Sequence, residues 1–353
     1  MKYGKVIKIT EKLRERTKVV VLMGDREELA INYNSITGNI QVNDKVLLNT
    51  TAIELNLGTG GYHFVMYNYG KAYQSPQKKG HIMKCRYTPF QLRVMSAEEE
   101  NSPYNSVFHN FRSLDNFPVL VGSLHSMLMP AVATLKYLNS KIKIAYIMTD
   151  AGSLPIYFSD SIYQLKHKKL LDTTITVGHA FGGDLETVNI YNGIIAAKEV
   201  AKCDIAIVSM GPGVVGTGTP YGFTGIEQGN ILDIVNDLGG LSIGIPRISF
   251  AEKRPRHQGV SHHSLTVFGK VTKTKCQLIF PSLKENQRNY IFNQIESLKI
   301  NHKHNIIEID GKILSDALYH FDLTVNTMGR NYDNDPSFFL TCSAAALYGF
   351  GKL

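Results

Sequence analysis

The chain has 353 residues, of which 43% are hydrophobic and 19% are charged, and its formal net charge is +8 at pH 7. The length predicts two domains, and the composition is typical of a soluble globular protein. Every apolar run is shorter than the roughly 18 residues that a transmembrane helix requires, and the first residues interleave charged with apolar side chains. We therefore expect a cytoplasmic protein without a membrane span or a signal peptide.

The positive charge is concentrated in one short segment. Residues 251–275 contain six lysines and arginines, one glutamate and three histidines. Such a concentration favours a local anion-binding site over a surface that coats nucleic acid.

The first 70 residues are predicted to form a small β-barrel-like domain. Apolar segments bounded by turn signals predict strands at 6–9, 18–22, 29–33 and 46–49. Residues 71–116 lack a sustained period and are interpreted as a connector with one or two helical turns.

From residue 117 to the end, apolar runs alternate with helical patterns. Strands are predicted at 119–121, 142–148, 174–177, 205–208, 241–245, 277–280 and 305–309. Helices are predicted near 127–138, 161–170, 185–200, 224–238, 313–321 and 338–348. This alternation implies right-handed crossovers, so residues 117–353 are predicted to form an α/β, Rossmann-like domain with a mostly parallel, doubly wound sheet.

The residues that follow these strands carry most of the unusual side chains. In an open parallel sheet every strand-to-helix loop leaves from the same edge, where ligands bind. Five consecutive loops carry Gly, His, Asp, Ser or Arg: 122–125, 149–155, 178–184, 211–219 and 246–249 with 254–257. We therefore predict a ligand site at the carboxyl edge of the sheet.

The loop after the fourth strand of this sheet matches the pattern G-x-G-x-x-G. Backbone N–H groups at such a turn can hold a phosphate or carboxylate. The ligand-binding candidates in this loop are Gly211, Gly213, Gly216, Thr217 and Gly218. A dinucleotide site is disfavoured because later glycines and a proline postpone the helix, and a P-loop lacks its Gly-Lys-Ser/Thr. An anion cradle and a loop that packs tightly or acts as a lid both stay open.

Two histidines and two aspartates follow strands, and each also has a structural interpretation. His179 is a candidate for proton transfer, and Asp150 or Asp184 could orient a histidine or hold a divalent ion. His125 is a candidate ligand-binding residue, or else a hydrogen-bonded histidine at a helix start. Asp150 could be a turn former, and Asp184 could be the N-cap of the helix near 185–200.

The basic segment supplies further candidates. Arg247, Arg256 and His257 are predicted to hold negative charge, although 254–257 could also be a solvated loop. In the stretch SHHS, adjacent side chains diverge by about 100° on a helix, so we expect one of the two histidines at the site. His262 is the second candidate for proton transfer. No G-x-S-x-G or H-E-x-x-H pattern occurs, so an esterase-like triad is disfavoured and any metal is undetermined.

Several of these segments together resemble one protein family. The segments are GSLHS, TDAGSLP, GHAFGGDLETVN, MGPGVVGTGTPYGFTG, RHQGVSHHS and TMGRNYDNDPSFF. They are similar to a bacterial family catalogued as a domain of unknown function, and the resemblance covers most of the chain. It implies no activity and transfers no catalytic role.

We therefore expect a protein that binds a small anionic ligand, phosphorylated or nucleotide-like, at the carboxyl edge of its sheet. Hydrolysis or group transfer is the chemistry that such a site would most simply perform, but the sequence leaves open whether the protein is an enzyme. The alternative is a non-catalytic sensor whose β-domain contacts a partner. A nucleic-acid-associated protein is the third and least favoured possibility. Cofactors are undetermined, and a homodimer is expected.

Overall fold

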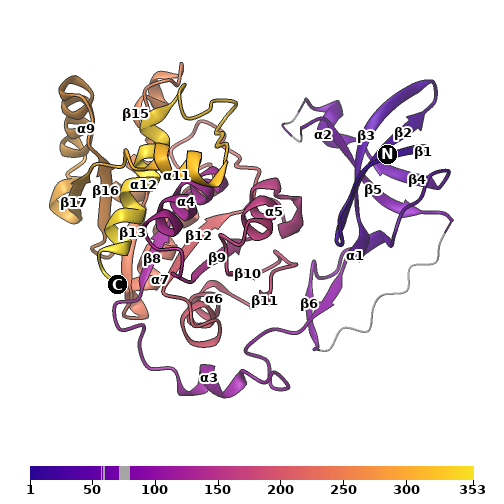
Figure 1. Ribbon diagram of the computed structural model, residues 1–353, viewed down its shortest axis with the longest axis horizontal. Helices are drawn as coiled ribbons and strands as arrows, with labels where there is room; N and C mark the ends of the chain where they lie inside the picture. The colour runs from indigo at the N-terminus through magenta and orange to yellow at the C-terminus, as the bar shows by residue number, and fades with distance from the viewer. Residues whose placement is uncertain (57, 59, 71–79) are drawn as a thin grey trace. The chain divides into compact units, whose positions relative to one another are not determined.

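The computed structural model describes residues 1–56, 58, 60–70 and 80–353. The chain forms two compact units, Met1–Val94 and Met95–Leu353 (Figure 1). Of the predicted connector 71–116, residues 71–79 lie outside the described part. The rest contains the hairpin of β6 (Ile82–Lys84) with β7 (Leu92–Val94) and the helix α3 (Asn105–Asn110).

The first unit contains a closed five-stranded barrel with the strand order β1-β2-β3-β5-β4. Its strands are β1 (Lys2–Lys12), β2 (Arg16–Met23), β3 (Arg26–Tyr33), β4 (Lys45–Asn49) and β5 (Tyr62–Asn68), with the short helices α1 (Asn34–Thr37) and α2 (Thr51–Glu54). Alternate apolar residues such as Val19, Val21, Val46 and Leu48 fill the interior. The predicted small β-barrel is confirmed, and β5 is a fifth strand that the sequence patterns did not predict.

The second unit is built on an eight-stranded sheet in which all neighbouring strands are parallel. From one edge to the other, its strands are β11 (Leu185–Glu186), β10 (Thr173–Thr176), β9 (Ile144–Thr149), β12 (Ile205–Met210), β8 (Pro118–Val121), β13 (Leu241–Gly244), β16 (Gln277–Pro281) and β17 (Asn305–Ile309). The predicted α/β class with a parallel sheet is therefore confirmed. Because β12 lies between β9 and β8, the order differs from that of the dinucleotide-binding sheet.

Helices cover both faces of this sheet because its central strands are apolar on both sides. One face packs against α4 (Leu128–Leu138), α5 (Asp160–His167), α11 (Leu314–Phe321) and α12 (Pro336–Phe350). The other packs against α6 (Ile190–Ile195), α7 (Glu227–Asp237) and α9 (Glu285–Ser297). In β8, for example, Leu120 faces the first layer, whereas Val119 and Val121 face the second.

Shorter elements connect these layers. They are the hairpin strands β14 (Ile248–Ser249) and β15 (Gly259–Val260), the helices α8 (His262–Thr266) and α10 (Ile300–Lys303), the 3₁₀ turns His125–Met127, Ile156–Phe158, Thr224–Ile226 and Pro255–His257, and the π-helical segments Ala196–Val200 and Val267–Val271. Among the described residues no helix is both long and apolar enough to cross a membrane.

The predicted helix over 185–200 begins later than expected. Leu185 and Glu186 pair with β10 as the edge strand β11, and α6 starts only after Asn189, whose side chain accepts a hydrogen bond from the Asn192 amide. Asp184 is therefore not a helix N-cap. Because β11 runs parallel to β10, the chain between these two strands returns toward the amino end of the sheet before β11 begins.

Candidate functional site

The parallel register brings the loops after β8, β9, β10, β12 and β13 to one edge of the sheet. Asp150 and His179, in the loops after β9 and β10, are connected there through the backbone. The Asp150 Oδ2 atom accepts a hydrogen bond from the His179 amide at 2.9 Å. Gly178 has a φ of 61°, and a Cβ at this position would overlap the Asp150 carboxylate. The glycine thus permits Asp150 to anchor the neighbouring loop.

The other predicted aspartate lies elsewhere. Asp184 accepts hydrogen bonds from the Thr174 amide and hydroxyl, both at 2.8 Å, and from Lys166 Nζ at 2.7 Å. Although burial raises the pKa of Asp184, these hydrogen bonds lower it below its usual value. Thr174 is near the amino end of β10, so the structure does not bring Asp184 together with Asp150 and His179.

His125 has protein partners on both ring nitrogens. Its Nδ1 lies 3.0 Å from the Tyr146 hydroxyl, and its Nε2 lies 2.6 Å from the Ser159 hydroxyl. Burial lowers the pKa of His125 to about 4. These contacts favour the structural interpretation, in which His125 connects β9 to the N-cap of α5.

Glu227 is a carboxylate at this edge that no sequence motif indicated. It lies in the first turn of α7, and its Oε1 atom accepts a hydrogen bond from the Thr149 hydroxyl at the end of β9. Burial raises the pKa of Glu227 to about 7, with a smaller contribution from Asp150. A carboxyl group with a pKa near neutrality can exchange a proton under physiological conditions. Its sequence signal was an acidic residue in the first turn of the helix that follows the glycine-rich loop.

The glycine-rich loop packs closely against the loop after β9. The Ser153 amide donates to the Pro212 carbonyl at 2.7 Å. A Cβ at Gly211 would overlap the Ser153 carbonyl oxygen, and a Cβ at Gly152 would overlap that of Gly211. Tight packing therefore explains these two glycines.

Farther along, the glycine-rich loop is exposed. Gly213 and Gly218 have φ values of 110° and 81°, a region that favours glycine. The Thr217 hydroxyl contacts the Thr219 hydroxyl at 2.9 Å, and a Cβ at Gly216 would lie 3.3 Å from the His263 ring. The anion cradle at these residues stays a prediction.

We use the name histidine cluster for His257, His262 and His263, whose rings lie together beside the glycine-rich loop. The ring centroids of His262 and His263 are 4.2 Å apart, and His257 is 4.8 Å and 5.1 Å from them. The His263 ring also stacks on Phe223 at 4.0 Å. The expectation that adjacent histidines would diverge is wrong, because rotation about the side-chain bonds brings both rings to the same side of the first turn of α8.

The pKa of each residue in the histidine cluster is lowered, which favours the neutral form of all three rings. Burial, followed by Arg247 and other nearby cations, lowers the pKa of His257 to about 3. Burial, followed by the neighbouring His262, lowers the pKa of His263 to about 4. Burial also lowers the pKa of His262. Neutral imidazoles are the form that binds metal ions. These three residues are the group in the described part of the chain that could hold one.

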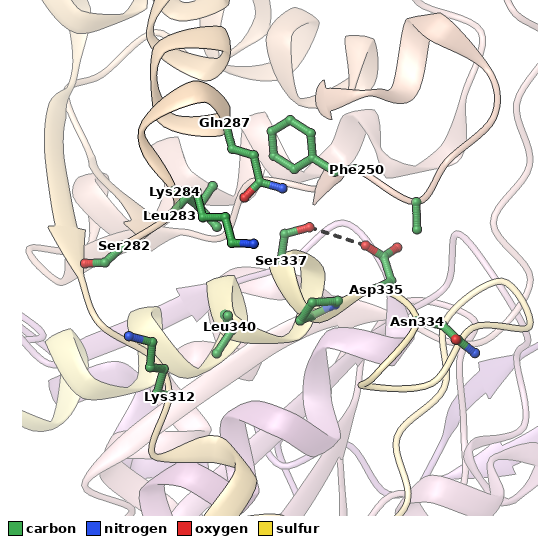
Figure 2. Close-up of a pocket in the computed structure, with 12 residues that line it drawn as sticks. Phe250, Ser282, Leu283, Lys284, Gln287, Lys312, Asn334, Asp335, Ser337 and Leu340 are labelled. Atoms are coloured by element: carbon green, nitrogen blue, oxygen red, sulfur yellow. Dashed lines mark hydrogen bonds between the residues drawn. The ribbon is translucent and has the colours of Figure 1, made fainter.

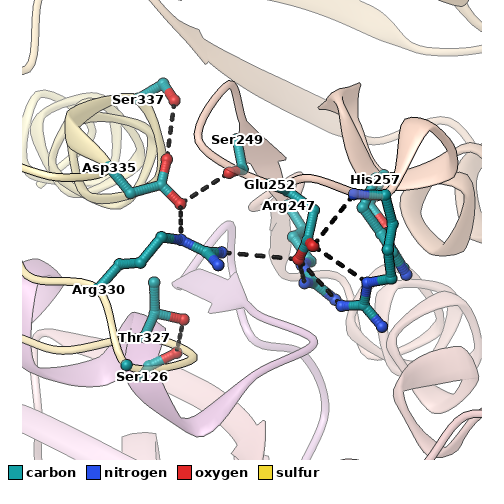
Figure 3. Close-up of polar contacts among 12 residues, drawn as sticks. Ser126, Arg247, Ser249, Glu252, His257, Thr327, Arg330, Asp335 and Ser337 are labelled. Atoms are coloured by element: carbon teal, nitrogen blue, oxygen red, sulfur yellow. Dashed lines mark hydrogen bonds and ion pairs between the residues drawn. The ribbon is translucent and has the colours of Figure 1, made fainter.

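A network of arginines and carboxylates borders the histidine cluster (Figure 3). Arg254 binds both oxygens of Glu252 at 3.0 and 2.9 Å, and the hydrogen bonds from Arg254 lower the pKa of Glu252 to about 2. Arg247 and Arg330 approach the same carboxylate at 3.6 and 3.8 Å. Arg330 also donates to Asp335 at 3.0 Å. Three guanidinium groups therefore share two carboxylates, which leaves this region positively charged.

Arg247 is the predicted anion-binding residue most deeply placed in this network. It is 4% exposed, and its Nη2 atom has no hydrogen-bond partner among the described residues. Burial lowers its pKa to about 10. Arg256, in contrast, is exposed on the 3₁₀ turn Pro255–His257 and is close enough to contribute to the lowered pKa of His262.

A pocket of about 720 Å³ opens beside this network, at the carboxyl ends of β16 and β17 (Figure 2). Lys284, at the start of α9, extends its ammonium group toward it (Figure 2). Lys312, after β17, also lines the pocket, and its Nζ atom lies 3.3 Å from Asp310 Oδ2. Asp335 lies in its wall and accepts a hydrogen bond from Ser249 at 2.7 Å. We call it the lysine pocket. None of the residues predicted from the sequence lines it, because lysines after two late strands gave no recognisable motif.

Comparison with known proteins gives a family but no function. A family model described as "Protein of unknown function (DUF3866)" matches residues 29–346. No curated protein and no solved structure matches the chain. The predicted resemblance to a family of unknown function is confirmed, and its bacterial origin stays a prediction.

Proposed function

The chain belongs to the family of proteins of unknown function DUF3866, and we propose that it binds a small anionic ligand, phosphorylated or nucleotide-like, in the lysine pocket. One observation carries this proposal: Lys284, Lys312 and the first turns of α9 and α12 line a single pocket of about 720 Å³. That volume is within the range of small-molecule sites, about 300–1,000 Å³.

The two helix starts favour negative charge in the lysine pocket. Neither α9 nor α12 has a side-chain hydrogen bond that caps its N-terminus. Backbone N–H groups in an uncapped first turn, together with the helix dipole, attract anions. Lys284 adds a charge that can move to meet a phosphate, and Lys312 adds a second ammonium group, which is paired with Asp310 at 3.3 Å.

The Asp335 carboxylate in the wall of the lysine pocket does not oppose the binding of an anion. Asp335 accepts hydrogen bonds from Ser249, Ser337 and Arg330, so its charge is already compensated. The excess positive charge of the arginine network lies directly behind it. In this proposal Arg247 and Arg256 strengthen the positive potential, and the pocket lysines make the contacts. We propose the cytoplasm as the location, in keeping with the sequence.

Calorimetric titration with inorganic phosphate, pyrophosphate and ATP tests the proposal. We expect binding by the parent protein and at least tenfold weaker binding by the double variant Lys284→Ala/Lys312→Ala. The matched control is Lys141→Ala/Lys143→Ala, which removes the same charge from exposed lysines just before β9, at the opposite edge of the sheet. Equal affinities in the parent and the pocket variant, or no binding of any of the three anions, would overturn the proposal.

Hydrolysis or group transfer is the second candidate function, and Glu227 favours it. Its pKa of about 7 suits a general base or acid, and Asp150 and His179 lie in the adjoining loops. These residues do not line the lysine pocket, so this second function would act on a substrate bound at the loops after β9 and β10. Product analysis of any anion that binds distinguishes an enzyme from a sensor. We expect Glu227→Gln to abolish turnover while anion binding persists; a sensor would form no product with either protein.

A further inference from the structure

The histidine cluster has the geometry of a metal site. His257 ends the 3₁₀ turn Pro255–His257, and His262 and His263 begin α8. One ring nitrogen from each lies within 4.8 Å of the others, and elsewhere in the described ranges no three histidine, cysteine or acidic side chains converge in this way. We propose that the histidine cluster binds a divalent transition-metal ion of the zinc type.

The distances require a small adjustment. Zinc–nitrogen bonds of about 2.0–2.1 Å in a tetrahedral site place the nitrogens about 3.3 Å apart. The cluster is therefore too open by at most about 1.5 Å, given ligand atoms within 4.8 Å of one another. His262 and His263 are only partly buried, so rotation of their side chains can close this gap.

Two contacts already orient the rings as a metal site requires. The His257 Nδ1 atom lies 2.7 Å from the Ser261 hydroxyl, which leaves Nε2 as the ligand atom. Metal-binding histidines usually have such a partner on the second nitrogen, which fixes the ring. Ser261 also caps α8 by accepting a hydrogen bond from the His263 amide. The stack on Phe223, with ring planes 7° apart, holds the His263 ring.

His262 supplies an independent observation. Its Nε2 atom is buried and has no hydrogen-bond partner. A buried polar nitrogen without a partner loses its hydrogen bonds to water and gains none in return, so it destabilises the folded protein. A metal ion among the three rings would satisfy this nitrogen, and no protein group in the described structure does so.

The surrounding charges suggest what completes the coordination. Arg247 and Arg254 lie close to the cluster and disfavour a bare cation, although Glu252 pairs with both. A three-histidine set leaves the fourth zinc position open for water or a ligand. The positive neighbours therefore favour hydroxide or another anion at that position. The metal site does not depend on the lysine pocket, because none of the cluster residues lines it.

Cobalt(II) titration of the chelator-treated 353-residue protein tests the inference without an activity assay. We expect the visible absorption of tetrahedral cobalt to rise to one equivalent per chain, and zinc to displace it. The substitution His262→Ala should weaken the affinity for cobalt at least a hundredfold. Because its Nε2 makes no hydrogen bond, we expect this variant to fold, which circular dichroism checks.

The matched control is His109→Ala/His302→Ala, which removes two exposed histidines outside the cluster. This control should bind cobalt as the parent does. The inference is overturned if the parent binds no cobalt or zinc, if folded His262→Ala binds as well as the parent, or if the control loses binding to the same extent. Weak anion binding by the lysine-pocket variant would leave this result unaffected, so the two proposals fail separately.

Discussion

Arg254 holds both carboxylate oxygens of Glu252, at 3.0 and 2.9 Å, while Glu252 itself is only 7% exposed. This bidentate ion pair holds the loop between β14 and β15 in place and also neutralises charge. Ser126 and Thr327, 3.0 Å apart, bring the segment of Arg330 to the same region from the far end of the sequence. Glu252 is thus the central acceptor for arginines from two distant segments (Figure 3).

Replacing Glu252 with glutamine should destabilise the protein by about 3 kcal/mol, because the buried Arg247 guanidinium loses its counter-charge and the more exposed Arg254 and Arg330 lose theirs in part. Urea denaturation measures the change. Glu308→Gln is the matched control, since Glu308 pairs with the exposed Arg288 and its loss should have a much smaller effect. Equal destabilisation by the two substitutions would show that Glu252 is not the central acceptor.

Glu227 should make stability fall as the pH rises. Its folded pKa of about 7 exceeds the ordinary value of 4.5, so the folded state binds its proton more tightly than the unfolded state. Its contribution is fully present below about pH 4.5 and is lost between about pH 4.5 and 7, amounting to up to roughly 3 kcal/mol.

Denaturant unfolding across this pH range, compared between the parent and Glu227→Gln, checks this prediction. The variant should lack this component and be more stable than the parent at pH 8. A pH profile that is unchanged by the substitution would contradict the raised pKa.

Gly211→Ala should destabilise the protein by roughly 1–3 kcal/mol, because the added Cβ would meet the Ser153 carbonyl oxygen, which is backbone and cannot rotate away. Thermal unfolding measures the loss. Gly351→Ala is the control, since its Cβ would make only ordinary contacts at 3.6 Å near the end of α12. If Gly211→Ala melts like this control, the loops after β9 and β12 do not require the close approach.

The alternation of apolar runs predicted most of the second unit. The expected strand at 305–309 coincides with β17, and the expected helix at 313–321 differs from α11 by one residue. The helix at 185–200 was misplaced because two of its residues gain more by pairing with β10 than by continuing a helix. The strand β5, which pairs with β3 and β4, was missed.

The candidate site was less predictable. Asp150 and His179 could be expected to meet, because both follow neighbouring parallel strands. The sequence could not exclude Asp184 from the candidate site, because its position depends on where the chain turns back between β10 and β11. Glu227 and the lysine pocket were missed because ordinary acidic and basic residues acquire their role from burial and from the elements around them.

By itself the sequence determined the α/β class, the N-terminal barrel and the edge of the sheet at which unusual side chains gather, since these follow from local periodicity and from the geometry of parallel strands. The tertiary structure alone decided which side chains meet. It brought His257 to within 5.1 Å of His263, surrounded Glu252 with arginines from separate loops, and left Arg247 buried. Side-chain rotation, burial and loop packing set these contacts, and none of them leaves a periodic signal in the order of residues.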